Sequence, residues 1–256
     1  MTLAITLALG AVIGTFLGLL GGGGSILAVP ALVYVLGIPV EHAIPMSLIV
    51  IAIASAVGAL PKVVTGHVQW RLAGVFAAAG IPATFLGTAI GRQLPQDVVL
   101  IGFAMVMIAA GVRMLMDDGD VGTACRVGKS GIDWRRCAPR SIPAGLAVGL
   151  LTGLFGVGGG FLIVPVLVLL LGVQMPVAIG TSLLVIVANS LAGTISHLGG
   201  GAIDWRTTAA FVGAAVVGSL IAGQLGNLID TRRLQRWFAY LVLVVAAYVV
   251  TDTVLH

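Results

Sequence analysis

The chain has few charged residues, few aromatic residues and few cysteines. Of its 256 residues, 9% are charged, 6% are aromatic and 59% are hydrophobic, and the mean hydropathy is +1.16. Soluble domains carry about 25% charged residues. A water-soluble chain of this length could not bury so much apolar surface. The composition therefore excludes a soluble globular protein and predicts a single membrane domain in a lipid bilayer.

Other shortages narrow the function. Cys125 and Cys137 are the only cysteines, and their spacing fits no common zinc or redox motif, which favours reduced thiols over a disulfide or a metal site. There is no His-Glu-x-x-His, no Walker loop and no Gly-x-Ser-x-Gly motif. The apolar segments also lack paired carboxylates, so we expect no enzyme, no metal and no cofactor. The basic residues lie in loops without aromatic neighbours, so we expect no nucleic-acid partner.

What the chain does have is an internal repeat. Residues 14–71 align without a gap on residues 149–206, at a constant offset of 135 residues (149 − 14), and 24 of the 58 pairs are identical. A duplicated hydrophobic segment interrupted by glycines is typical of transporters that bind substrate at the repeat interface. The identical pairs include Gly18/Gly153, Gly21/Gly156, Gly23/Gly158, Gly24/Gly159, Pro30/Pro165, Gly37/Gly172, Ser47/Ser182, Gly58/Gly193 and Trp70/Trp205.

Each half contains five apolar segments, which predicts an all-α polytopic membrane protein with eight to ten membrane segments. The segments are 3–20, 26–36, 44–63, 72–90 and 98–116, then 142–155, 161–171, 178–198, 207–228 and 234–254. Residues 1–116 and 142–256 are the two predicted repeats of one membrane domain. The polar residues 117–141 between them are the predicted cytoplasmic linker.

The second segment of each half is short. A membrane-crossing helix takes about 20 residues, whereas 26–36 and 161–171 are well under that length. Each follows a run of glycines and contains a proline. We therefore expect a half-helix, or a hairpin folded back on the first segment, with its glycine loop facing the protein interior.

The distribution of Lys and Arg favours inverted repeats. If each half crosses the membrane an odd number of times, eleven of the 13 basic residues lie on one side, and only Arg92 and Arg206 lie on the other. With four crossings in each half, the division is nine to four. Because basic residues concentrate in the cytoplasm, the eleven-to-two division predicts inverted repeats with both termini outside.

The two glycine loops are the first candidate substrate site. Glycine lets backbone N–H groups approach a ligand, and the N-terminus of the following half-helix favours an anion. The other interpretation is close helix packing by small residues, which suits Gly14 and Gly18. The candidate residues are Gly21, Gly22, Gly23, Gly24 and Ser25 in the first loop, and Gly156, Gly158, Gly159 and Gly160 in the second.

Polar residues of the third segment of each half are further candidates. Ser47, Thr181 and Ser182 could donate to a bound anion or cap a helix, and these roles are compatible. Ser55 matches Ser190, and Asn189 stands where the first half has Ala54. Lys62 matches His197. Either could neutralise an anion or couple transport to a proton, or Lys62 could extend its amine to the interface.

The two glycine loops, each ending in Val-Pro, precede Gly180-Thr181-Ser182-Leu183 in the second half and a Gly-x-x-Asp/Gln-Trp-Arg turn in both halves. In this order the motifs resemble the sulfite exporter TauE/SafE family, also called the 4-toluene sulfonate uptake permease family, over almost the whole chain. The resemblance implies a multi-pass permease of the cytoplasmic membrane for sulfite, thiosulfate or organosulfonates. Pro45-Met46-Ser47 departs from the Gly-Thr-Ser pattern, and Lys62 stands where a histidine is common.

The sequence thus predicts a secondary transporter for a small sulfur-containing anion, working by alternating access. The anion is expected between the glycine loops, with hydrogen bonds from Ser47, Thr181, Ser182 and Asn189 and compensating charge from Lys62 or His197. Two alternatives are a passive anion channel and an accessory membrane subunit without transport of its own.

The predicted topology can be checked with a reporter. A reporter fused to the C-terminus is expected outside the cytoplasm, since five segments in each half return the chain to its starting side. Paired alkaline phosphatase and fluorescent-protein fusions report the two locations. A cytoplasmic C-terminus would contradict five-plus-five inverted repeats.

Overall fold

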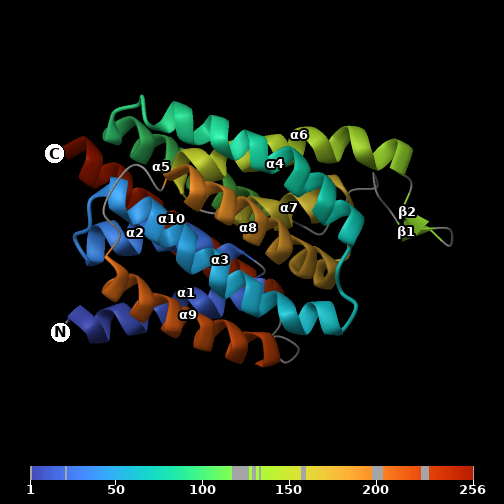
Figure 1. Ribbon diagram of the computed structural model, residues 1–256, viewed down its shortest axis with the longest axis horizontal. Coiled ribbons are helices and arrows are strands. Elements are labelled where there is room, and N and C mark those ends of the chain that lie inside the picture. Colours follow the sequence, from blue (N-terminus) through green and yellow to red (C-terminus); the bar gives the residue numbers. More distant parts are fainter. Residues whose placement is uncertain are drawn as a thin grey trace.

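The computed structural model describes residues 2–20, 22–116, 127–128, 131–132, 134–156, 160–197, 204–225 and 231–255. These residues form a bundle of helices that lie side by side (Figure 1). The first half comprises α1 (Thr2–Leu20), η1 (Gly23–Leu27), α2 (Ala28–Pro30), η2 (Ala31–Val35), α3 (Val40–Val64), α4 (Trp70–Gly91) and α5 (Gln96–Met116). The second comprises α6 (Trp134–Phe155), α7 (Gly160–Pro165), η3 (Val166–Leu170), α8 (Met175–His197), α9 (Trp205–Leu225) and α10 (Thr231–Leu255).

The prediction of an all-α membrane protein is confirmed. Within the described residues, five helices are long and apolar enough to cross a membrane, in α1, α3, α4, α8 and α9. Two-residue strands, β1 (Val127–Gly128) and β2 (Gly131–Ile132), pair between the halves. One boundary differs from expectation, because α6 begins at Trp134 and not near residue 142. The polar residues from Trp134 form one continuous helix with the apolar segment that follows them.

The two half-helices have the same internal construction. Pro30 and Pro165 each lack the N–H that a helix would use, and a π-turn follows each of them, at η2 and η3. In each half-helix the first N–H after the π-turn bonds back five residues, at 3.3 Å (Leu36 to Ala31, Leu171 to Val166). Both segments then end at a glycine with positive φ, +67° at Gly37 and +69° at Gly172, which is the usual way to stop a helix.

The first half-helix folds back along α1, as expected from its length. The N–H of Gly22 bonds to the carbonyl oxygen of Leu17 at 3.3 Å. A Cβ atom built on Gly24 would lie 2.7 Å from the backbone nitrogen of Leu17. The residues from Gly22 onward therefore run back along α1, inside the bundle.

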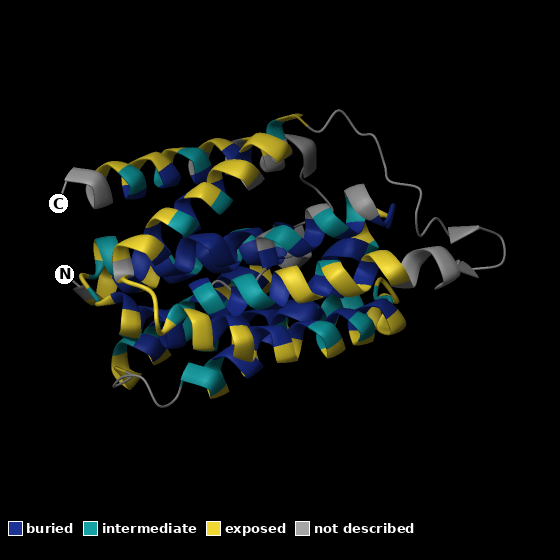
Figure 2. Cartoon of the chain, turned by 90° about the horizontal axis from the view of Figure 1, so that it is seen from above, coloured by how far each residue is buried: buried dark blue, intermediate teal, exposed yellow. Residues whose placement is uncertain are grey.

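The main helix pairings join the two halves of the chain. α1 packs against α9, while α6 packs against α4. The long central helices α3 and α8 pack against each other, and α5 packs against α10. Figure 2 shows that buried residues concentrate in the middle of the bundle and exposed ones on its outer helices. Each half therefore depends on the other to cover its apolar faces.

The ends of the chain lie together. Figure 1 shows both termini at one end of the bundle and the β1–β2 hairpin at the opposite end. Each half runs back and forth along the bundle, and α10 of the second half ends at the end of the bundle where α1 begins.

Rows of glycines bring α1 close to α9 and α6 close to α4. A Cβ atom on Gly18 would lie 2.9 Å from the Cβ atom of Ala222, and one on Gly149 would lie 2.6 Å from the Cα atom of Gly80. Such separations leave no room for a side chain, so the backbones touch as in other small-residue membrane interfaces. The rows are Gly10, Gly14 and Gly18 on α1, and Gly145, Gly149 and Gly153 on α6.

Replacing Gly149 by leucine is expected to destabilise the protein by about 1–3 kcal/mol or more, because the new side chain overlaps the backbone of α4. The measurement is the thermal unfolding midpoint of detergent-purified protein. Gly213→Leu on α9 is the control, since a Cβ atom there would meet nothing within 4 Å. Equal midpoints for the two variants would contradict the packing argument.

Candidate functional site

Gly22 of the first glycine loop and Gly160 of the second lie against each other inside the bundle. A Cβ atom on Gly22 would lie 2.7 Å from both the carbonyl carbon and the carbonyl oxygen of Gly160, and one on Gly160 would lie 2.9 Å from the Cα atom of Gly22. The δ-methyl group of Ile186 on α8 would lie 2.6 Å from either Cβ atom. Gly22 also has φ +128°, which side-chain-bearing residues rarely adopt. The two loops are thus in backbone contact beside the centre of α8.

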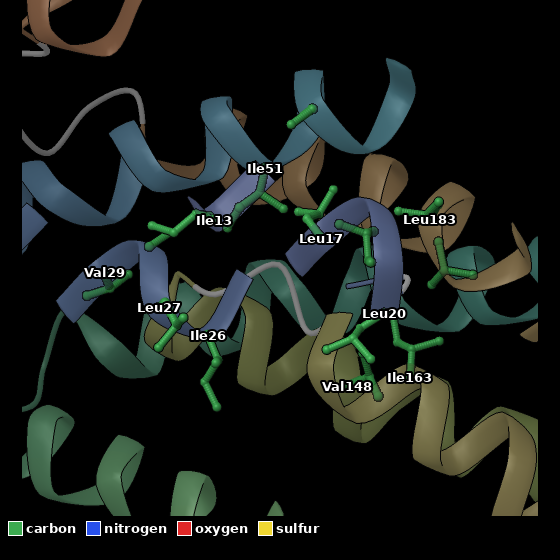
Figure 3. Packing of buried hydrophobic residues seen from close by; sticks show 14 of the residues in the cluster. Ile13, Leu17, Leu20, Ile26, Leu27, Val29, Ile51, Val148, Ile163 and Leu183 are labelled. Atoms are coloured by element: carbon green, nitrogen blue, oxygen red, sulfur yellow. The ribbon is translucent and has the colours of Figure 1, made fainter. Parts of the chain in front are cut away.

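Apolar side chains from both halves surround this contact. Figure 3 shows Leu17 and Leu20 of α1 near Ile163 of α7 and Leu183 of α8, and all four belong to one buried cluster. The predicted site residues Gly23, Gly24 and Ser25 are buried here as well. Gly21, Gly158 and Gly159 lie outside the described residues.

Ser25 and Ser182 donate hydrogen bonds to nearby backbone. The Ser25 hydroxyl donates to the carbonyl oxygen of Gly22 at 2.7 Å, and the Ser182 hydroxyl donates to that of Ile179 at 2.8 Å. Gly24 packs against α1, so close packing explains part of the glycine run. The two interpretations of the first loop are therefore compatible: Gly24 serves packing, whereas Gly22 lies against the other loop.

Ser47 of the first half holds the loop of the second half. Its hydroxyl lies 2.7 Å from the carbonyl oxygen of Gly156 and 2.7 Å from that of Ile44, and shares its proton between them. Gly156 has φ +69°, and a Cβ atom there would lie 2.9 Å from the Cβ atom of Ile44. α3 thus positions the second glycine loop through one buried hydroxyl.

Thr181 lies at the end of the bundle where α3 leads into α4. Its hydroxyl oxygen accepts a hydrogen bond from the backbone N–H of Gln69 at 3.0 Å. A Cβ atom on the adjacent Gly180 would lie 3.1 Å from the Cβ atom of Lys62. Lys62 is half-buried there, beside the start of α8. The sequence alone does not reveal this contact, because it joins the start of α8 in the second half to the end of α3 in the first half.

His197 lies at the other end of the central helices. Its Nδ1–H donates to the carbonyl oxygen of Gly193 at 2.9 Å, and Nδ1 lies 3.5 Å from the Thr88 hydroxyl. The Thr88 and Ser196 hydroxyls are 2.9 Å apart, and Arg92 donates to the carbonyl oxygen of Ser196. Sequence reasoning missed Thr88, Ser196 and Arg92, since no motif links α4 to the end of α8.

Lys62 and His197 do not share one site. Lys62 lies beside the start of α8, whereas His197 is at the end of α8.

Asn189 lies in the middle of α8 and is fully buried. A Cβ atom on Gly80 of α4 would lie 2.5 Å from its amide oxygen and 2.8 Å from its amide nitrogen. Neither amide atom has a hydrogen-bond partner among the described residues, and neither do the buried hydroxyls of Ser55 and Ser190. Within the part of the chain that the structure describes, no three His, Cys, Asp or Glu side chains gather as a metal site would require.

The turns before α4 and α9 have a structural role. The Asp204 carboxylate accepts hydrogen bonds from the N–H of Arg206 at 3.1 Å and of Thr207 at 3.3 Å, which caps α9. The Thr207 hydroxyl also donates to it, and these bonds, led by that from the hydroxyl, lower the carboxyl pKa below its usual value. Gln69, which matches Asp204 in the sequence repeat, precedes α4 and makes no side-chain cap for it.

The cap predicts an acid-dependent contribution to stability. Because the folded-state pKa of Asp204 is lowered, its stabilising effect is present above the ordinary carboxyl pKa and is lost as pH falls through the lowered value. Asp204→Asn is expected to remove this pH dependence while keeping part of the cap. Unfolding midpoints of both proteins from neutral to acidic pH test this, and parallel curves would contradict it.

Apolar helices of membrane-spanning length, packed side by side, define a multi-pass membrane protein. The family model described as sulfite exporter TauE/SafE matches residues 6–249. A probable membrane transporter protein of Xylella fastidiosa (strain Temecula1 / ATCC 700964) is 36% identical over 97% of this chain and 95% of its own. The probable membrane transporter protein YunE of Bacillus subtilis is 26% identical over 91% and 90%.

The chain thus belongs to the sulfite exporter TauE/SafE family, which makes it a membrane transporter. No solved structure matches it.

Proposed function

We propose that the protein is a secondary transporter that moves small sulfur-containing anions, such as sulfite, thiosulfate or organosulfonates, across the cytoplasmic membrane. The observation that carries the proposal is the contact of the two glycine loops at Gly22 and Gly160, inside the bundle and beside the middle of α8. Backbone N–H groups of such loops recognise an anion without a charged side chain. The membership in a family described as sulfite exporters supports the choice of anion.

Alternating access follows from the arrangement of the halves. The matching central helices α3 and α8 run in opposite directions along the bundle, which supports the interpretation of the sequence repeat as an inverted repeat. Their main contacts join α1 to α9, α4 to α6 and α3 to α8. Rocking one half against the other at these contacts opens the loops first to one side and then to the other.

Lys62 and His197 have separate roles in this proposal. Each is half-buried, and they lie at opposite ends of the central helices. We assign them to the two entrances, where they attract the anion, and His197 is also placed to exchange a proton during coupling. Arg92 lies beside His197 and adds a second basic group at that end.

The proposal predicts selective binding and saturable uptake of a sulfur anion. Unfolding midpoints of the purified protein are measured against sulfite, thiosulfate, sulfate, sulfoacetate, an arenesulfonate and matched carboxylates. A true ligand at a hundredfold excess over its Kd stabilises the protein by about 2.7 kcal/mol. Uptake of that ligand into proteoliposomes is then expected to saturate.

Gly160→Val is expected to lose both responses, because its side chain overlaps the Gly22 backbone and Ile186. Gly74→Ala is the control, since a Cβ atom there meets nothing within 4 Å. Uptake that never saturates would indicate a channel instead. Unimpaired uptake by Gly160→Val would refute the loop site.

A further inference from the structure

Two buried serines lack the hydrogen bond that buried hydroxyls in these helices usually make. The Thr84 and Thr152 hydroxyls each donate to the carbonyl oxygen four residues earlier, at 2.9 Å. Ser55 on α3 and Ser190 on α8 are fully buried, yet their hydroxyls have no partner among the described residues. A helix always offers a serine the carbonyl oxygen one turn back. These two hydroxyls are therefore turned away from an available acceptor.

Asn189, next to Ser190, is the third such group. It is fully buried, and both its amide nitrogen and its amide oxygen are unpartnered among the described residues. An unpaired buried amide destabilises the folded protein relative to an alanine at the same position, so the amide needs a compensating partner. Gly80 leaves the space that the amide occupies.

The three residues lie at the level where α3 and α8 cross. A Cβ atom on Gly58 of α3 would lie 3.9 Å from the Cδ1 atom of Leu183 on α8, and one on Gly193 of α8 would lie 3.0 Å from that of Leu48 on α3. Early residues of each helix thus meet late residues of the other, so the helices are antiparallel.

The crossing point follows from these contacts. The positions midway between them are residue 53, from (58 + 48)/2, and residue 188, from (183 + 193)/2. At about 1.5 Å of rise per residue, Ser55, Asn189 and Ser190 all lie within about 3 Å of the crossing along the helix axes. Ile186 of the same helix touches both glycine loops. The unpartnered polar groups therefore lie at the level where the loops meet.

The buried polar side chains are neutral dipoles, not charged groups. Among the residues whose burial the structure describes, the buried polar side chains are hydroxyls and the Asn189 amide, and none is ionisable. The free energy lost when an ion leaves water rises with the square of its charge, so a dianion loses about four times as much as a monoanion. Neutral donors compensate the smaller loss far more readily.

We propose that the substrate is bound as a monoanion at the α3–α8 crossing, by the hydroxyls of Ser55 and Ser190 and the amide of Asn189. The inference rests on the proposed transport of sulfur anions and specifies its chemical class. That class comprises organosulfonates with one negative charge and hydrogen sulfite, in preference to the dianions sulfite and sulfate. The amide oxygen of Asn189 accepts a hydrogen bond from the proton that hydrogen sulfite carries and a fully ionised oxyanion lacks.

The first experiment compares anions on the unaltered protein. Kd values are measured by calorimetry for methanesulfonate, sulfate and total sulfite, over the pH range in which hydrogen sulfite loses its proton. Sulfate is expected to bind at least tenfold more weakly than methanesulfonate. The affinity for total sulfite should fall as pH rises, while that for methanesulfonate stays constant. The sulfonate controls for titration of His197, which would affect both anions alike.

The second experiment removes the polar groups. Ser55→Ala, Ser190→Ala and Asn189→Ala are each expected to raise the Kd for methanesulfonate at least fivefold. The ligand-free unfolding midpoint should stay constant or rise, because an unpaired buried polar group is lost. Thr194→Val on α8 is the matched control, because its hydroxyl already donates to the Ser190 carbonyl oxygen at 2.8 Å. Its Kd is expected to change less than twofold.

Three results would overturn the inference while leaving the proposed function intact. The first is that sulfate binds as tightly as methanesulfonate. The second is that all three site variants keep the affinity of the unaltered protein. The third is that the variants lose affinity and also have lower ligand-free unfolding midpoints, which would indicate a structural role. Failure of the unaltered protein to bind any sulfur anion would overturn the proposed function itself.

Discussion

Contact between backbones at glycine is the interaction on which the rest of this structure depends. Gly149 lies against Gly80 where α6 meets α4, and Gly22 lies against Gly160 where the two loops meet. Helices in lipid gain little from hydrophobic burial against one another, so close packing and interhelical hydrogen bonds must hold them. In the proposed function, the missing side chains of Gly22 and Gly160 also leave backbone groups open to an anion. Packing and the proposed binding then depend on one property, the missing side chain.

A second constraint is that polar groups in lipid need partners. Most buried hydroxyls here bond to backbone carbonyls, and one of them, on Ser47, reaches the Gly156 carbonyl of the other half. Ser55, Asn189 and Ser190 stand apart because their polar atoms have no partner among the described residues. The proposed substrate site at the α3–α8 crossing rests on these three side chains more than on the glycine motif.

Much of the fold could be predicted from local pattern. Apolar length predicted the long helices, and the glycine–proline spacing predicted the short segments after each loop. Local pattern gave no start for α6, which begins at Trp134 within the polar range 117–141 and continues into the apolar segment 142–155. The site was harder to predict, because its contacts connect distant residues. Thr88 and Arg92 approach His197 only because α4 packs beside α8.

By itself the sequence determined that this chain lies in a membrane, is built from a duplicated unit and carries a glycine loop in each half. These properties depend on composition and on neighbours along the chain. Only the tertiary structure decided that Lys62 and His197 lie at opposite ends, that Ser47 holds the opposite loop, and that Asn189 lies against Gly80. Those arrangements follow from how the two halves pack across each other, and helix packing joins residues that no local pattern connects.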